Sequence, residues 1–203
     1  AFQEVMMIKK LTIILLIVMI LVFSNEVLIA EKWNPFKFQG TEKFNYLIEL
    51  YEGEELRREM QYIVELNPTD QTDENGEKLY EVSYTRKGNI TESRLSDQIF
   101  FGYSGFEMIG FFINPMYYPM ISDLDIVVGE KALIYGIGKV NITSKEEVYG
   151  REGFVCELYS TGDEEKLMAV FVIAPQIPMP LKVTVYNDVG EINSEVHLVE
   201  YRE

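Results

Sequence analysis

Few side chains in this sequence could form a catalytic or metal centre, because the 203-residue chain has one histidine, His197, and one cysteine, Cys156. Zinc fingers, iron–sulfur clusters and histidine-rich zinc hydrolase sites each need three or four such ligands. A Ser-His-Asp triad would have to use His197, and no G-x-S-x-G turn accompanies it. The sequence therefore predicts no catalytic residues, no metal site and no cofactor, and a protein that is not an enzyme.

Carboxylates, in contrast, are abundant. The chain has 33 Asp and Glu against 18 Lys and Arg, a net charge of −15 and a pI near 4.5. Glycoside hydrolysis needs one defined carboxylate pair, and so many acids single out none. Residues 70–76 lack the spacing of an EF-hand calcium loop. The acidic charge also repels phosphate backbones, so nucleic acid is excluded as an expected partner.

Two short motifs are candidate sites of glycosylation, and the single cysteine lies in an apolar run. Asn89-Ile90-Thr91 and Asn141-Ile142-Thr143 are glycan acceptor sequons, so Asn89 and Asn141 are predicted glycosylation sites in a host with that machinery. Cys156 lies in the apolar run 154–158. This setting predicts a small buried residue in place of a reactive thiol.

The N-terminal segment has the layout of an export signal. Lys9 and Lys10 precede thirteen residues, 11–23, of which only Thr12 is not strongly apolar, and a small residue, Ala30, follows. A basic region, an apolar region of roughly 7–15 residues and a small residue before the cut define a signal peptide. Two interpretations stay open: a signal cleaved after Ala30, or an anchor retained in the membrane through residues 11–30. Both predict residues 31–203 as a single exported domain that is periplasmic, extracellular or at the cell surface.

The pattern after residue 30 predicts an antiparallel β domain. Residues 56–66 alternate apolar and charged positions, and a short turn at 52–55 joins them to a second run at 44–51, which predicts a hairpin. A polar stretch, 67–78, predicts a solvated loop before a third strand containing Tyr80, Val82 and Tyr84. Further strands are expected at 132–137, 139–149, 153–161, 166–174, 181–187 and 191–202. The gaps between them are too short for helical crossovers, so a meander is expected, with 166–174 as a central strand.

One aromatic segment, residues 96–125, fits neither the two-residue period of a strand nor the 3.6-residue period of a helix. Its glycines and prolines allow only short helices, and a stretch this apolar must either cover the apolar face of a sheet or hold an apolar ligand. Both alternatives remain open from the sequence. The candidate ligand-binding residues are Phe100, Phe101, Phe106, Met108, Phe111, Phe112, Tyr117 and Tyr118.

The order of these elements, together with the turn Pro178-Met179-Pro180-Leu181-Lys182 into the penultimate strand, resembles the periplasmic lipoprotein-carrier (LolA-like) superfamily over about residues 40–203. The resemblance implies a mainly β fold of the β-rich α+β type. Its sheet would be a strongly curved antiparallel half-barrel that stays open, covered by a short helical lid, here residues 96–125. The apolar N-terminal segment adds one expected hydrophobic helix that precedes this domain in the chain. The resemblance also implies acyl chains or an apolar partner between sheet and lid, and no catalytic residues.

Two functions from different classes follow. The first is a membrane-associated, extracytoplasmic, non-enzymatic protein that binds an apolar or lipid-like ligand in the concave face of the sheet, under the lid. The second is a structural or protein-interaction module of the cell surface without a small ligand. A continuous apolar cavity would favour the first, and an exposed apolar patch or sheet edge the second.

Overall fold

The computed structural model of the chain describes residues 31–35, 37–89, 92, 125–134, 137–161 and 164–203. The chain divides into two units, residues 1–30 and residues 31–203, and the second unit holds all the described residues. The predicted N-terminal helix and the predicted lid, apart from Asp125, lie outside the described residues and stay predictions. Within the described ranges, no helix has the length and apolar character needed to cross a bilayer.

The described part of the chain is almost entirely β. Two short strands, β1 and β5, pair with each other, and nine strands form one antiparallel sheet. The strands are β1 (Glu31–Lys32), β2 (Glu42–Glu52), β3 (Glu55–Thr72), β4 (Lys78–Gly88), β5 (Asp125–Ile126), β6 (Lys131–Ile134), β7 (Gly138–Val148), β8 (Arg151–Tyr159), β9 (Leu167–Ile173), β10 (Lys182–Tyr186) and β11 (Ile192–Arg202).

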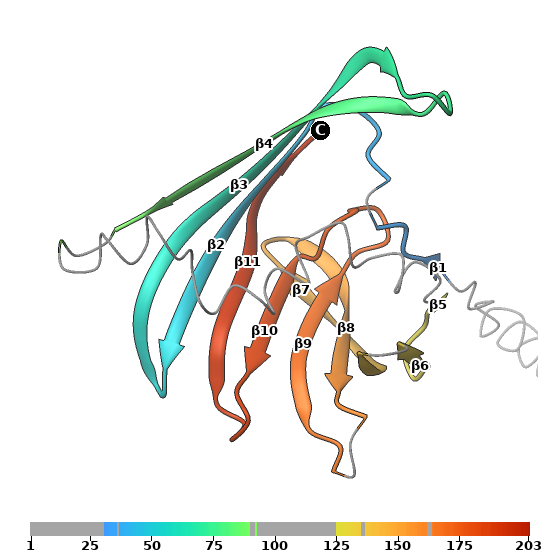
Figure 1. Ribbon diagram of the computed structural model, residues 1–203. Coiled ribbons are helices and arrows are strands. Elements are labelled where there is room, and N and C mark those ends of the chain that lie inside the picture. The colour runs from blue at the N-terminus through green and yellow to red at the C-terminus, as the bar shows by residue number, and fades with distance from the viewer. Residues whose placement is uncertain (1–30, 36, 90–91, 93–124, 135–136, 162–163) are drawn as a thin grey trace, which may run out of the picture. The chain divides into compact units, whose positions relative to one another are not determined.

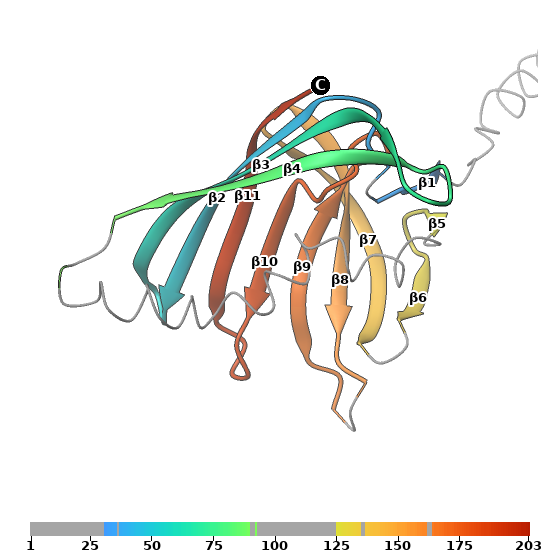
Figure 2. The ribbon, with the colours of Figure 1, turned by 45° about the horizontal axis from the view of Figure 1, so that its top comes forward.

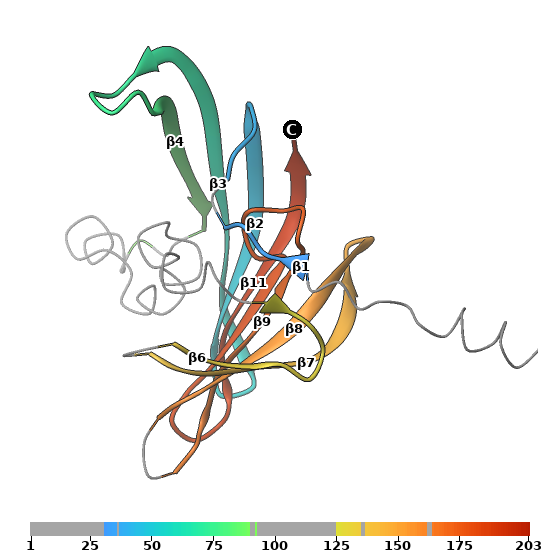
Figure 3. The same cartoon turned by 90° about the vertical axis from the view of Figure 1, so that its right-hand side faces the viewer.

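The large sheet is a meander whose two halves meet between β2 and β11. Its strand order is β4-β3-β2-β11-β10-β9-β8-β7-β6, with β4 and β6 at opposite edges, so the sheet is open (Figure 1). All its pairs are antiparallel, as the short connections require. The strands fan out with a strong twist, and seen from the side the sheet curves between β3 and β7 (Figures 2 and 3). The predicted mainly β, open antiparallel architecture is confirmed.

The meander from residue 131 onward follows the alternating sequence closely. Each of its six strands overlaps the predicted run, and β9 is a central strand between β8 and β10. The hairpin of β2 and β3 is also as predicted, with Gly53 in the turn at φ 60°. Another tight turn joins β7 to β8, where Tyr149 and Gly150 both have positive φ, as the favoured two-residue hairpin turn demands.

The predicted loop at 67–78 is wrong over half its length. β3 continues to Thr72, paired with β4 through Pro68 opposite Tyr80 and a bulge between Pro68 and Thr72. The chain turns only at 73–77, where Asp73 Oδ1 accepts hydrogen bonds from the backbone N–H groups of Asn75 (2.9 Å) and Glu77 (2.8 Å). Polar residues here indicate exposure, because the β3–β4 ribbon extends past the buried part of the sheet.

The connection between β9 and β10 is buried and closes one end of the sheet. Tyr46, fully buried on β2, donates a hydrogen bond to the Pro180 carbonyl at 2.9 Å. Trp33 is also fully buried, and its indole N–H donates to the Ile177 carbonyl at 2.8 Å. These bonds satisfy buried carbonyls of an irregular segment that has no strand partner to do so. They tie the loop and the chain before β2 to the same core.

Candidate functional site

One face of the nine-stranded sheet, called here the apolar face, carries a continuous row of uncharged side chains. Cross-strand neighbours connect this row through seven strands, from β3 to β7, and every member is at most 3% exposed. The row consists of Met60, Ile48, Val196, Val183, Phe171, Cys156 and Ile142. A full row without a charge is more than a one-layer sheet can keep in water, so this face must be covered.

A second row runs beside the first and contains one polar side chain. Its members are Leu50, Ser194, Val185, Ala169, Leu158, Val140 and Ala132. Ser194 is 0% exposed, and its hydroxyl has no hydrogen-bond partner. A buried hydroxyl without a partner costs about 1–3 kcal/mol relative to one that is bonded. The apolar face therefore offers one unused donor and acceptor group.

Cys156 lies on β8 within the apolar face, directly between its cross-strand neighbours Ile142 and Phe171. It is fully buried, and burial raises the pKa of its thiol to about 12. The predicted buried, unreactive cysteine is confirmed, because the thiolate that would react is strongly disfavoured here.

The described parts of the chain before and after the aromatic segment lie at opposite edges of this sheet. Residue 89 follows β4 at one edge, and residue 125 begins β5, a few residues before β6 at the other edge. Strands lie about 4.8 Å apart, so eight spacings put about 38 Å of sheet between the edges. The 36 residues from 89 to 124 could reach about 120 Å when extended. The connection is therefore long enough to cross the sheet and to fold on the way.

The eight predicted ligand-binding residues, Phe100 to Tyr118, all lie outside the described residues, so the structure does not test them. Of the two predicted glycosylation sites, Asn89 is exposed just after β4. Asn141 lies within β7, and its side-chain oxygen is buried without a hydrogen-bond partner. Both assignments stay predictions.

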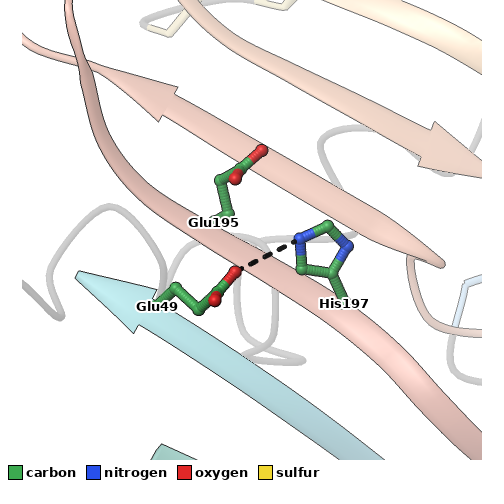
Figure 4. A group of neighbouring side chains, drawn as sticks. All are labelled: Glu49, Glu195 and His197. Atoms are coloured by element: carbon green, nitrogen blue, oxygen red, sulfur yellow. Dashed lines mark ion pairs between the residues drawn. The ribbon is translucent and has the colours of Figure 1, made fainter. Parts of the chain in front are cut away.

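The opposite face of the sheet, called here the polar face, carries charged side chains together with Val155, Val170 and Val172 of β8 and β9. It holds a cluster that the sequence did not reveal. Glu195 on β11 lies directly across from Glu49 on β2, and His197 follows two residues after Glu195 on the same face. His197 Nε2 is 3.8 Å from Glu49 Oε2, and one potential ligand atom from each of the three residues lies within 4.8 Å of the others (Figure 4). All three side chains are half-buried.

Two hydroxyls contact the carboxylates of this cluster. Thr184 Oγ1 donates to Glu195 Oε1 at 3.2 Å. The Tyr51 hydroxyl lies 3.3 Å from Glu195 Oε2 and 3.4 Å from Glu49 Oε2. Burial, followed by the charges of the two glutamates, raises the pKa of Tyr51 to about 12, so this hydroxyl remains a proton donor at neutral pH.

Comparison with known proteins finds similarity only at the level of backbone path. No family model matches the sequence, and no curated protein matches it. A solved structure of MucB is similar at a TM-score of 0.42 and 8% identity over 81% of this chain and 53% of that one. The chain thus spans about half the length of that protein.

Two further solved structures are similar over most of their own length. One is described as an exported protein with a YmcC-like fold from Bacteroides fragilis, at a TM-score of 0.34 and 10% identity over 86% of this chain and 100% of that one. The other is described as an outer membrane lipoprotein-sorting protein domain from Vibrio parahaemolyticus. Its TM-score is 0.26 and its sequence identity is 14%, over 82% of this chain and 86% of that one. The similar structures therefore include the class of protein that the sequence resemblance pointed to.

Proposed function

We propose that this chain is a non-enzymatic, extracytoplasmic, membrane-associated protein that binds an apolar or lipid-like ligand between the apolar face and residues 96–125. The observation that carries the proposal is the uncharged row of side chains crossing seven strands of an open sheet. A face of this kind offers a long apolar channel once a second layer lies over it.

We infer that the aromatic segment supplies that second layer. Because the chain leaves the sheet after β4 and is next described at β5, near the opposite edge, the connection that contains this segment has to pass over one of the two faces or around an end. Its Phe, Tyr and Met side chains are suited to the apolar face, whereas the polar face carries charged groups such as Glu49 and Lys182. Crossing the apolar face would place Phe106 and Phe111 above the row that includes Phe171.

The buried hydroxyl of Ser194, which has no hydrogen-bond partner, favours a bound ligand over a simple packed core. A core of two apolar layers would leave this hydroxyl without a partner, at the cost given above. A ligand with an acyl chain and one carbonyl or carboxyl oxygen would fill the channel and accept the hydrogen bond of Ser194. We infer an acyl-bearing lipid or fatty acid as the ligand class.

Export supports the same function. The basic, apolar and small-residue regions within 1–30 would bring the domain to a membrane, cleaved or anchored, where such ligands are found.

A second candidate function rests on the edge strand β4. Eleven residues long, β4 has one neighbour, β3, among the described strands, and Leu79, Val82 and Tyr84 are 40–55% exposed. An edge of this length can bind an extended segment of another protein as an additional strand. This would be the interaction module without a small ligand.

The first experiment is native mass spectrometry of the full chain purified from membranes of the expressing cell, followed by solvent extraction of the bound material. We expect additional mass that extracts as lipid. It should be lost in Phe106→Asp and Phe111→Asp, because a charge in the channel would exclude acyl chains. Val189→Asp, at a position 78% exposed in the turn before β11, is the matched control and should keep the lipid.

A bare protein mass, together with no uptake of added fatty acid, would overturn the ligand-binding proposal. Equal lipid on the control and on both phenylalanine variants would place any lipid elsewhere, for example on the N-terminal segment. Either result would shift the assignment to the interaction module, which predicts that the β4 amides pointing away from β3 exchange slowly only when a partner is present.

A further inference from the structure

We propose that Glu49, Glu195 and His197 form a binding site for a divalent transition-metal ion, with Zn²⁺ as the representative ion, on the polar face of the sheet. The site is separate from the proposed ligand channel, because successive residues of a strand point to opposite faces. Val196, between Glu195 and His197, belongs to the apolar face.

The donor set suits zinc. Zn²⁺ accepts imidazole nitrogen and carboxylate oxygen, and three protein ligands with a fourth position left for water are a common arrangement. Here two carboxylates and one imidazole come from two paired strands, so their backbone is rigid. The site differs from the histidine-rich and cysteine-rich centres that the composition excludes, since it needs only one histidine.

The distances fit an ion between the side chains. Ligand atoms about 2.0–2.1 Å from a tetrahedral zinc lie about 3.3 Å from one another. The 3.8 Å between His197 Nε2 and Glu49 Oε2 is close to that value and too long for a hydrogen bond. Because the ligand atoms of all three residues lie within 4.8 Å, small side-chain rotations would complete the site.

The charge pattern of the strands independently calls for a cation. Glu195 and Glu49 are direct cross-strand neighbours, and Glu49 is also the direct neighbour of Glu59 on β3. Like charges directly opposite one another destabilise a sheet. Among the described residues, the ion pair of Glu49 is with His197, which has to be protonated to neutralise any charge. A divalent ion would neutralise the two ligating carboxylates.

The surrounding hydroxyls would orient the ligands. Thr184 fixes one oxygen of Glu195, and Tyr51 lies between the facing oxygens of the two glutamates. Such outer partners hold metal-binding carboxylates in place, and their removal typically costs 10–100-fold in metal affinity. Tyr51 is therefore a positioning residue in this site.

The test is a Zn²⁺ titration of the full chain. Calorimetry measures the affinity and the stoichiometry, and NMR monitors the imidazole signal. Because the chain has a single histidine, a shifted imidazole signal can only come from His197. We expect one Zn²⁺ per chain with a simultaneous imidazole shift, and an affinity loss of about 100-fold or more in Glu49→Gln and Glu195→Gln. Tyr51→Phe should lose about 10-fold.

Two controls make the result specific. Glu157→Gln changes a carboxylate on the same polar face, on β8, and should bind Zn²⁺ as the unaltered chain does. Ca²⁺, which prefers oxygen ligands, should leave the imidazole signal unshifted. Saturation of Zn²⁺ binding only above about 1 mM would overturn the site. So would an affinity that Glu49→Gln and Glu195→Gln leave unchanged, or an imidazole signal that Zn²⁺ does not move.

Discussion

Cys156 gives the sharpest test of how completely the apolar face is covered. It is the only cysteine, it is 0% exposed, and it belongs to the row that would line the ligand channel, between Phe171 and Ile142. Disulfide reagents react with the thiolate, so the rate depends on both the thiol pKa and access to the sulfur. The rate at which a small neutral reagent, dipyridyl disulfide, modifies the folded chain therefore measures how often this face opens.

The expected slowing can be worked out from the structure. Burial raises the thiol pKa from 9.0 to about 12. At pH 8 this change reduces the thiolate fraction about 1,000-fold. The more basic thiolate is a better nucleophile, and at a Brønsted slope near 0.45 its rate constant with the reagent is about 20-fold higher. Folded protein should therefore react about 50-fold more slowly than protein unfolded in guanidinium from the pKa change alone, and more slowly still where the cover excludes the reagent.

The assay follows the absorbance of the released thiopyridone. Val189→Cys in a Cys156→Ala background is the control, since position 189 is 78% exposed and the thiol introduced there should react at the rate of the unfolded chain. Added fatty acid should slow the reaction of Cys156 further and leave the reaction of the control variant unchanged. A folded-state rate within about fivefold of the unfolded rate would refute the placement of Cys156 in a covered apolar face.

Three further predictions concern stability, each measured by chemical unfolding followed by circular dichroism. Tyr46→Phe should lose about 1–2 kcal/mol, because the Pro180 carbonyl loses its buried hydrogen bond; an unchanged midpoint would contradict this bond. Phe171→Ala should lose about 3–5 kcal/mol and the exposed Val189→Ala less than about 0.5 kcal/mol, so equal losses would refute the assigned burial. Burial raises the folded-state pKa of Cys156 above its value in the unfolded chain. The protonated thiol therefore makes its full contribution to the free energy of unfolding below pH 9, and this contribution is lost as the pH rises toward 12. The unaltered chain should therefore lose about 1 kcal/mol more than Cys156→Ala between pH 8.5 and 10, and parallel pH profiles would count against a buried thiol.

Much of the sheet could be predicted because alternation and pairing agree over most of its length. From residue 131 onward, most strands alternate apolar and polar positions, β9 is apolar on both faces as a central strand should be, and short turns allow only antiparallel neighbours. The prediction was wrong at residues 67–72, where polar residues and Pro68 indicate a loop. They continue β3 instead, since a ribbon exposed on both faces needs no apolar residue to remain paired with β4. The polar residues at 67–72 therefore predicted correctly that this stretch is exposed, and incorrectly that its backbone forms a loop.

The candidate sites divide in the same way. The apolar face could be inferred because apolar residues at every second position share one side of each strand. The cluster of Glu49, Glu195 and His197 could not, because it depends on β2 pairing with β11, strands from opposite ends of the domain, in one particular register. A shift by one residue would put Glu195 and His197 on the opposite face from Glu49. Only the paired strands reveal that these three side chains converge.

The central claim is that an acyl-bearing ligand lies against the apolar face, and photo-crosslinking tests it most directly. The full chain would be loaded with a fatty acid carrying a diazirine on its acyl chain, irradiated, digested and analysed by mass spectrometry. The account predicts saturable adducts on peptides containing β9 and β10, which supply Phe171 and Val183, and on the segment 96–125. Adducts confined to residues 1–30 or to the polar face, or no adduct that excess fatty acid competes away, would contradict it.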